Sequence, residues 1–146
     1  MLKGIDPLLS PALLHALAAM GHGDTIALVD ANFPAASTAR RLIELPGVAV
    51  DRALAAILSV LPLDTYVDSP AQTMQVVGDP YAQPAIYGVF QQQLAAAGAP
   101  PAQGLERFAF YAAAADAFAI VQTGERRLYG NILLRKGVVP PSAETT

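Results

Sequence analysis

Cysteine is absent from this chain of 146 residues, and its absence excludes several kinds of chemistry at once. Without a thiol the chain forms no disulfide, holds no zinc-thiolate centre and has no cysteine nucleophile. Histidine is scarce too, with two in the sequence. Because imidazole and thiolate are the ligands that transition metals favour in proteins, we predict no protein-held metal.

Familiar catalytic and nucleotide-binding motifs are missing as well. The chain contains no GxGxxG, no Walker loop, no HExxH and no GxSxG elbow. These gaps argue against nucleotide cofactors, zinc-protease chemistry and serine-hydrolase chemistry. We therefore predict no cofactor, and we expect the chemistry that remains to be proton transfer and hydroxyl recognition.

Charge is low, at 14% of residues, and the net charge is −3. There is no basic stripe, and the pairs Arg40-Arg41 and Arg126-Arg127 are expected to be solvated. We therefore exclude a nucleic-acid partner, which requires a clustered positive face. No apolar run approaches the ~20 residues that span a bilayer, and no secretory signal is recognisable. We predict a cytoplasmic protein without a membrane partner.

Hydrophobic residues are plentiful, at 53%, against a usual share of ~45–50%. Two interpretations of the surplus stay open. One is an alanine-rich sequence whose alanines lie on helix surfaces. The other is an apolar surface that becomes buried between subunits.

Short apolar runs alternate with amphipathic segments, which is typical of an α/β domain with helices packed on a sheet. Ser10 and Pro11 predict the start of a helix that ends by Gly21. The other predicted helices are 51–61, capped by Asp51, then 84–97 and 110–118. The predicted strands are 25–29, 41–45, 72–77, 119–122 and 132–134. We expect one domain over residues 1–139 and a flexible tail over 140–146.

Two polar residues flank the strand predicted at 25–29. His22 lies between two glycines, and its imidazole can donate or accept a proton near neutral pH. The alternative is a loop histidine with a local hydrogen bond. Asp30 follows the strand, where α/β sheets often open into a ligand crevice. Alternatively, Asp30 caps the following turn.

The other candidate site residues are weak evidence for a function when each is taken alone. Asp64 follows a predicted helix and would alone be an ordinary turn residue. Arg107 and Tyr111 are four residues apart, so a helix would place them on one side; core packing of the aromatics is the alternative. Tyr129 and Asn131 can hydrogen-bond hydroxyls, although glycine and asparagine also suit a hairpin turn.

Seven motifs, in order, resemble the ribose pyranase/fucose mutarotase family. They are MLKGI (1–5), MGHGD (20–24), DANFPA (30–35), LPLDTY (61–66), ERFAFY (106–111), TGE (123–125) and LYGNILLRKGV (128–138). The segment 78–101 and the tail match poorly. The residues after Asp30, together with Arg107 and Gly130, resemble the fucose-type branch.

The resemblance implies a cofactor-free isomerase that interconverts the α and β anomers of L-fucose. It implies His22 as the catalytic acid, and Tyr111 or Tyr129 as a second proton-transfer group. It also implies a three-layer helix/sheet/helix subunit with a mixed sheet, assembled with its copies into a decameric ring. Sugar contacts are implied for Asp30, Asp64, Arg107, Tyr111, Tyr129 and Asn131.

Three alternatives to this activity stay open at this point. A ribose pyranase would use the same acid–base groups on D-ribose. A non-catalytic monosaccharide-binding protein would hold sugar through Asp30, Asp64 and Asn131 without accelerating exchange. An oligomeric scaffold would bind no sugar at all.

Overall fold

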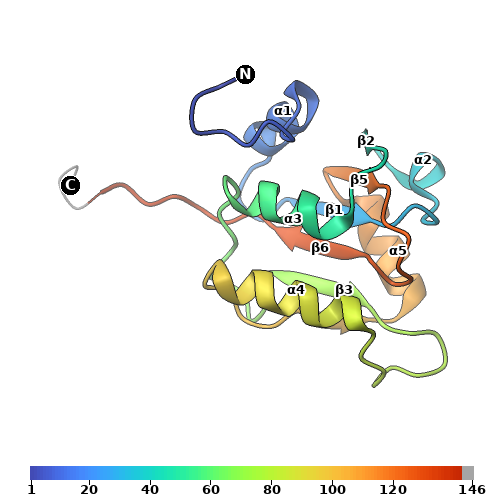
Figure 1. Ribbon diagram of the computed structural model, residues 1–146. Coiled ribbons are helices and arrows are strands. Elements are labelled where there is room, and N and C mark those ends of the chain that lie inside the picture. Colours follow the sequence, from blue (N-terminus) through green and yellow to red (C-terminus); the bar gives the residue numbers. More distant parts are fainter. Residues whose placement is uncertain (143–146) are drawn as a thin grey trace.

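A mixed sheet of six strands forms the middle layer of the computed structural model, which describes residues 1–142 (Figure 1). The strand order is β2-β5-β1-β6-β3-β4. β6 is antiparallel to both β1 and β3, whereas the β2–β5, β5–β1 and β3–β4 pairs are parallel. The strands are β1 (Thr25–Val29), β2 (Leu42–Leu45), β3 (Ala71–Met74), β4 (Gln103–Leu105), β5 (Ala119–Thr123) and β6 (Ile132–Arg135).

Helices cover both faces of the sheet, which confirms the predicted three-layer α/β domain. Alternate residues of β1 serve the two faces: Ile26 and Leu28 belong to one apolar core, and Ala27 and Val29 to the other. Helices α1 (Pro11–Ala19), α3 (Val50–Leu58) and α4 (Ala85–Ala96) pack on the first core. The second core is covered by α2 (Ala35–Thr38) and α5 (Arg107–Asp116).

The helix ends show where local sequence signals succeeded. The side chain of Ser10 accepts a hydrogen bond from the Leu13 N–H, as expected of a cap. The prediction for Asp51 was wrong, because Ala49 is the N-cap residue of α3. The Val50 N–H at this end donates to the distant Glu125 carboxylate instead. Helix α5 begins before the predicted residue 110, because the Glu106 side chain caps it.

Two short elements and the pairing of strand β6 were not predicted from the sequence. Neither the four-residue α2 nor the three-residue β4 was expected, since such short segments show no full period. The hairpin alternative for residues around Asn131 was wrong: β1 lies between β5 and β6, so residues 124–131 cross over it. Residues 143–146 of the predicted tail lie outside the described residues. Within residues 1–142, no helix is long and apolar enough to cross a membrane.

Candidate active site

A pocket of about 220 Å³ lies where β1 ends and β6 begins. We call it the Asp30 pocket. Its walls come from the β1–α2 loop, the end of β3, the first turns of α5 and the crossover before β6. The lining residues are Asp30, Asn32, Phe33, Met74, Val77, Arg107, Tyr111, Leu128, Tyr129 and Asn131. Five of the predicted site residues therefore meet in one concave place.

Asp30 and Asn131 are joined by two hydrogen bonds inside this pocket. The Asp30 N–H donates to Asn131 Oδ1 at 2.9 Å, and Asn131 Nδ2 donates to Asp30 Oδ2 at 3.1 Å. The Asn32 N–H donates to Asp30 Oδ1 at 2.9 Å, so Asp30 also caps the following turn. Burial raises the pKa of Asp30, and this outweighs the hydrogen bonds that favour its charged form.

Tyr129 adopts an uncommon backbone conformation beside Asn131. Its φ of 63° is the one positive value at a non-glycine position among residues 1–142. The Val77 N–H donates to the Tyr129 hydroxyl oxygen at 3.1 Å. Because this contact uses an oxygen lone pair, the hydroxyl proton stays available to donate to a ligand.

Arg107 and Tyr111 share one side of α5, as their spacing predicted. The Arg107 guanidinium stacks on the Phe108 ring at 4.4 Å. Its Nε is buried without a hydrogen-bond partner, and no acidic side chain among residues 1–142 forms an ion pair with it. Tyr111 packs edge-on against Phe33, with ring centroids 5.3 Å apart. Arg107 is therefore a donor suited to a polar ligand.

His22 lies elsewhere, in a cluster with Asp64 and Tyr66 that we call the His22 cluster. Its Nε2 is 3.2 Å from Asp64 Oδ1, and the His22 side chain is 46% exposed. The Tyr66 ring lies 5.4 Å from the imidazole. The Tyr66 N–H, followed by the contact with His22, holds the pKa of the buried Asp64 below its usual value. Asp64 can therefore orient the imidazole.

The end of β6 holds the two loops of the His22 cluster together. Lys136 Nζ donates to the carbonyls of Leu17 and Met20 at the end of α1, at 2.6 Å each. The Gly23 N–H donates to the Lys136 carbonyl, and the Asp64 N–H to the Arg135 carbonyl. These contacts fix the backbone on either side of His22 and at Asp64.

The predicted site residues thus form two groups at opposite ends of β1. His22 precedes this strand and Asp30 follows it. Five strand residues at ~3.3 Å each separate the groups by roughly 16 Å. The structure brings Asp64 to His22, not to Asp30. One chain does not place its own His22 beside its own Asp30.

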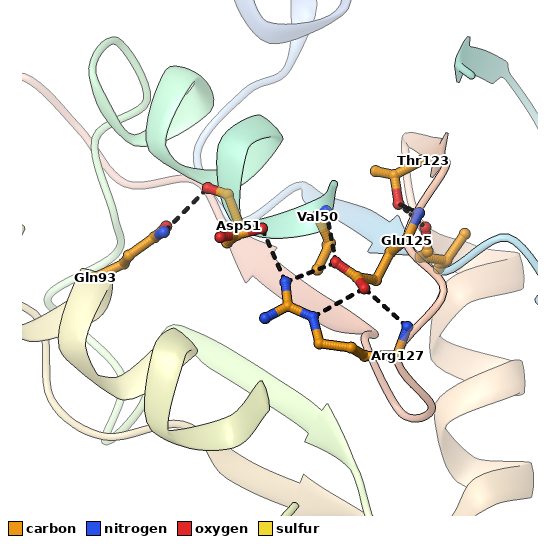
Figure 2. Close-up of polar contacts among 7 residues, drawn as sticks. Val50, Asp51, Gln93, Thr123, Glu125 and Arg127 are labelled. Atoms are coloured by element: carbon orange, nitrogen blue, oxygen red, sulfur yellow. Dashed lines mark hydrogen bonds and ion pairs between the residues drawn. The ribbon is translucent and has the colours of Figure 1, made fainter. Parts of the chain in front are cut away.

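Sequence reasoning missed Glu125, which is buried and contacts Val50 and Arg127 (Figure 2). Its carboxylate pairs with Arg127, which also reaches Asp51 at 3.0 Å. Arg127 was expected to be solvated with Arg126; both are exposed, but Arg127 also forms these two ion pairs. Arg41 is exposed as well, and its guanidinium stacks on the Phe118 ring at 4.0 Å. The position of Glu125 next to Gly124 in the TGE motif was the available signal.

Apolar walls of the pocket were also missed, because Phe33, Met74 and Leu128 look like ordinary core residues in sequence. Within residues 1–142, no three histidine, aspartate or glutamate side chains are grouped so that they could hold a metal ion.

The chain is similar to known fucose mutarotases. A fucose mutarotase of Bos taurus is 48% identical over 97% of this chain and 96% of its own length. The crystal structure of a Streptococcus pneumoniae fucose mutarotase in complex with L-fucose has a TM-score of 0.90 at 47% identity. It is matched over 95% of this chain and 100% of that one.

A more distant structure, Bacillus subtilis RbsD complexed with D-ribose, shares the fold. Its TM-score is 0.77 at 22% identity, over 96% of this chain and 100% of that one. A family profile described as the RbsD / FucU transport protein family matches residues 3–139. With this match and these relatives, the chain belongs to the RbsD/FucU family.

Proposed function

We propose that this protein is an L-fucose mutarotase, which interconverts the α and β anomers by acid–base catalysed ring opening and closure. The observation that carries the proposal is the Asp30 pocket, with its buried carboxylate, unpaired arginine and two tyrosines. The 47% identity to a fucose mutarotase crystallised with L-fucose supports it. Support for a ribose pyranase is weaker, because the ribose-bound relative is 22% identical.

The pocket suits a 6-deoxyhexose such as L-fucose, which carries several hydroxyl groups and one methyl group. Asp30 and Asn131 accept or donate hydrogen bonds to hydroxyls, and Arg107 donates. Phe33, Met74 and Leu128 offer an apolar wall for the methyl group.

Mutarotation requires one proton delivered to the ring oxygen and one removed from the anomeric hydroxyl. His22 would deliver the first, with Asp64 orienting its imidazole. Tyr111 or Tyr129 would serve as the second proton-transfer group. The reaction changes no oxidation state, and opening and reclosure return both protons, so side-chain acids and bases suffice.

Both groups of residues would act on one sugar if a neighbouring copy supplies the His22 cluster. Exposed apolar side chains border both places: Phe108, Leu128 and Val77 at the Asp30 pocket, and Tyr66 and Val67 at the His22 cluster. Such edges are typical of a surface that another chain covers. A head-to-tail contact that closes gives a ring, and we propose a decameric ring in the cytoplasm.

Two-dimensional exchange NMR of L-fucose at anomeric equilibrium, repeated with D-ribose, tests the activity. We expect exchange cross-peaks that grow with protein concentration, and more strongly for L-fucose. Binding without faster exchange would indicate a sugar-binding protein, and a larger effect on D-ribose would indicate a pyranase. A folded protein that does neither would overturn the proposal.

Mixed oligomers test the shared site. His22→Ala and Asp30→Asn chains are each expected to be inactive, and they are unfolded and refolded together. If sites form between chains, random pairing restores roughly a quarter of the sites with both native groups. Each variant refolded alone is the control. No recovery in a mixture that demonstrably contains hetero-oligomers would contradict a site shared between subunits.

A further inference from the structure

Glu125 makes an unusually complete set of hydrogen bonds for one buried side chain. Oε1 accepts from the Arg127 N–H at 2.8 Å and from Arg127 Nε at 2.9 Å. Oε2 accepts from Arg127 Nη2 at 2.8 Å and from the Val50 N–H at 3.2 Å. These donors, Arg127 above all, hold the pKa of Glu125 at about 2, so the carboxylate is charged at neutral pH.

The Glu125 backbone reaches the Asp30 pocket directly. Its carbonyl accepts from the Ala31 N–H at 2.9 Å, next to Asp30. Its N–H donates to Thr123 Oγ1, which in turn donates to the Val29 carbonyl at 2.8 Å. Glu125 is therefore hydrogen-bonded directly to the residue after Asp30 and, through Thr123, to the residue before it.

The Glu125 side chain also lies against the turn that carries Tyr129 and Asn131. A Cβ added to Gly130 would come 2.8 Å from Glu125 Cγ, closer than real contacts allow. Gly130 separates Tyr129, with its strained φ of 63°, from Asn131. A strained residue keeps its conformation only where its surroundings fix it.

The hydrogen bonds and ion pairs of Glu125 and Arg127 lead to the first turn of helix α3. Figure 2 shows Arg127 lying between Glu125 and Asp51 in the first turn of α3, with the side chain of Gln93 reaching toward Asp51 from α4. Gln93 Nε2 donates to the Asp51 carbonyl at 3.0 Å. The turn is thus fastened to two packed helices.

We propose that Glu125 is a positioning residue of the Asp30 pocket: its carboxylate fastens residues 125–131 to the start of α3 and so presents Tyr129 and Asn131 to the sugar. The proposal rests on the mutarotase function for its kinetic consequence. Its structural part concerns the free protein and stands without a substrate.

Glu125→Gln keeps the size of the side chain and removes its charge, so it is the primary variant. We expect KM for L-fucose exchange to rise roughly tenfold, with a smaller change in kcat, because a charged acceptor for several donors is lost. Arg127→Met should do the same, and the double variant should cost no more than the worse single one, since both act through one contact.

Arg52→Ala is the matched control. Arg52 lies on α3 beside Asp51 and forms an ion pair with Asp6 at 2.7 Å, and its side-chain hydrogen bonds go to Asp6, not to residues 125–131. We expect its KM and kcat to match the parent protein. A general weakening of α3 would change this variant too.

Backbone amide NMR shifts of the sugar-free protein separate this proposal from the proposed function. In Glu125→Gln the amides of Tyr129 and Asn131 should move clearly more than in Arg52→Ala. If they do so in a protein that does not accelerate exchange, the positioning role holds and the mutarotase proposal fails. The positioning role would be overturned if the amide shifts of Tyr129 and Asn131 did not change in Glu125→Gln. It would also be overturned if a folded and active Glu125→Gln protein had an unchanged KM. If Glu125→Gln does not fold, Arg127→Met carries the same test.

Discussion

Asp30 and Asp64 are both buried carboxylates, with 6% and 3% of their surface exposed, yet their pKa values move in opposite directions. Asp30 faces the neutral amide of Asn131 and the negative charge of Glu125, so burial prevails and its pKa rises. Asp64 receives the Tyr66 N–H and lies near His22 and Arg135, so its pKa falls. Similar exposure thus accompanies opposite pKa shifts, because burial is the largest influence on Asp30 and the Tyr66 N–H is the largest influence on Asp64.

The contrast extends to the two ends of β1. The Asp30 pocket is concave and rich in groups that recognise hydroxyls. The His22 cluster offers an oriented imidazole that is half exposed. The imidazole thus lies at one end of the strand, and the buried carboxylate lies at the other end with Tyr111 and Tyr129, the two tyrosines proposed for proton transfer.

The largest expected effect separates proton transfer from binding. His22→Ala should slow L-fucose exchange by about 10²–10⁴-fold, the usual contribution of a positioned acid. Sugar affinity, measured by titration, should change little, whereas Asp30→Asn should weaken binding itself. Equal losses of affinity in the two variants would contradict this division of roles.

The two ends of β6 should differ in tolerance of an added methyl group. In Gly137→Ala the new Cβ would lie 2.5 Å from the Leu63 carbonyl oxygen, which is backbone and moves little. In Gly130→Ala it meets the side chain of Glu125. We expect about 3 kcal/mol of destabilisation for the first and about 1 kcal/mol for the second, measured by denaturant unfolding. The reverse order would show that the Glu125 network is the stiffer element.

Asp64→Asn should have a smaller kinetic effect than loss of the imidazole. The amide keeps the shape of the side chain but orients His22 less well, so we expect kcat to fall about tenfold with little change in KM. Exchange rates over a range of sugar concentrations provide the measurement. A change confined to KM would place Asp64 in sugar binding instead.

The pH dependence of stability should differ in sign between the two carboxylates. Asp64, with a lowered pKa, stabilises the fold above about pH 4, and this stability is lost as the pH falls further. Asp30, with a raised pKa, contributes stability at low pH that is lost as the pH rises. From pH 3 to 7, Asp30→Asn should therefore gain stability relative to the parent protein, and Asp64→Asn should lose it. Urea unfolding at several pH values measures both trends, and parallel trends would refute the assignment.

Much of the fold was predictable because its signals are local. The buried strand at 25–29 and the cap at Ser10 both follow from neighbouring residues. The Glu125–Val50 contact was not predictable, since its partners are 75 positions apart and nothing in the sequence marks the pair. The same holds for β6, whose place between β1 and β3 depends on long-range pairing.

The separation of the candidate site could have been anticipated from one local fact. A five-residue strand between His22 and Asp30 must place them at opposite ends of that strand. The resemblance named the candidate residues together, and the strand between His22 and Asp30 divides them into two groups.

Strand β6 runs antiparallel to β1 and connects the Asp30 pocket to the His22 cluster. Its first residue follows Asn131 at the Asp30 pocket, and its last precedes Lys136 at the His22 cluster. Removing two residues would preserve which side chains face which core, yet it would shorten the interval between the two places by about 7 Å. Within one chain, the length of this strand therefore sets how far the His22 cluster lies from the Asp30 pocket.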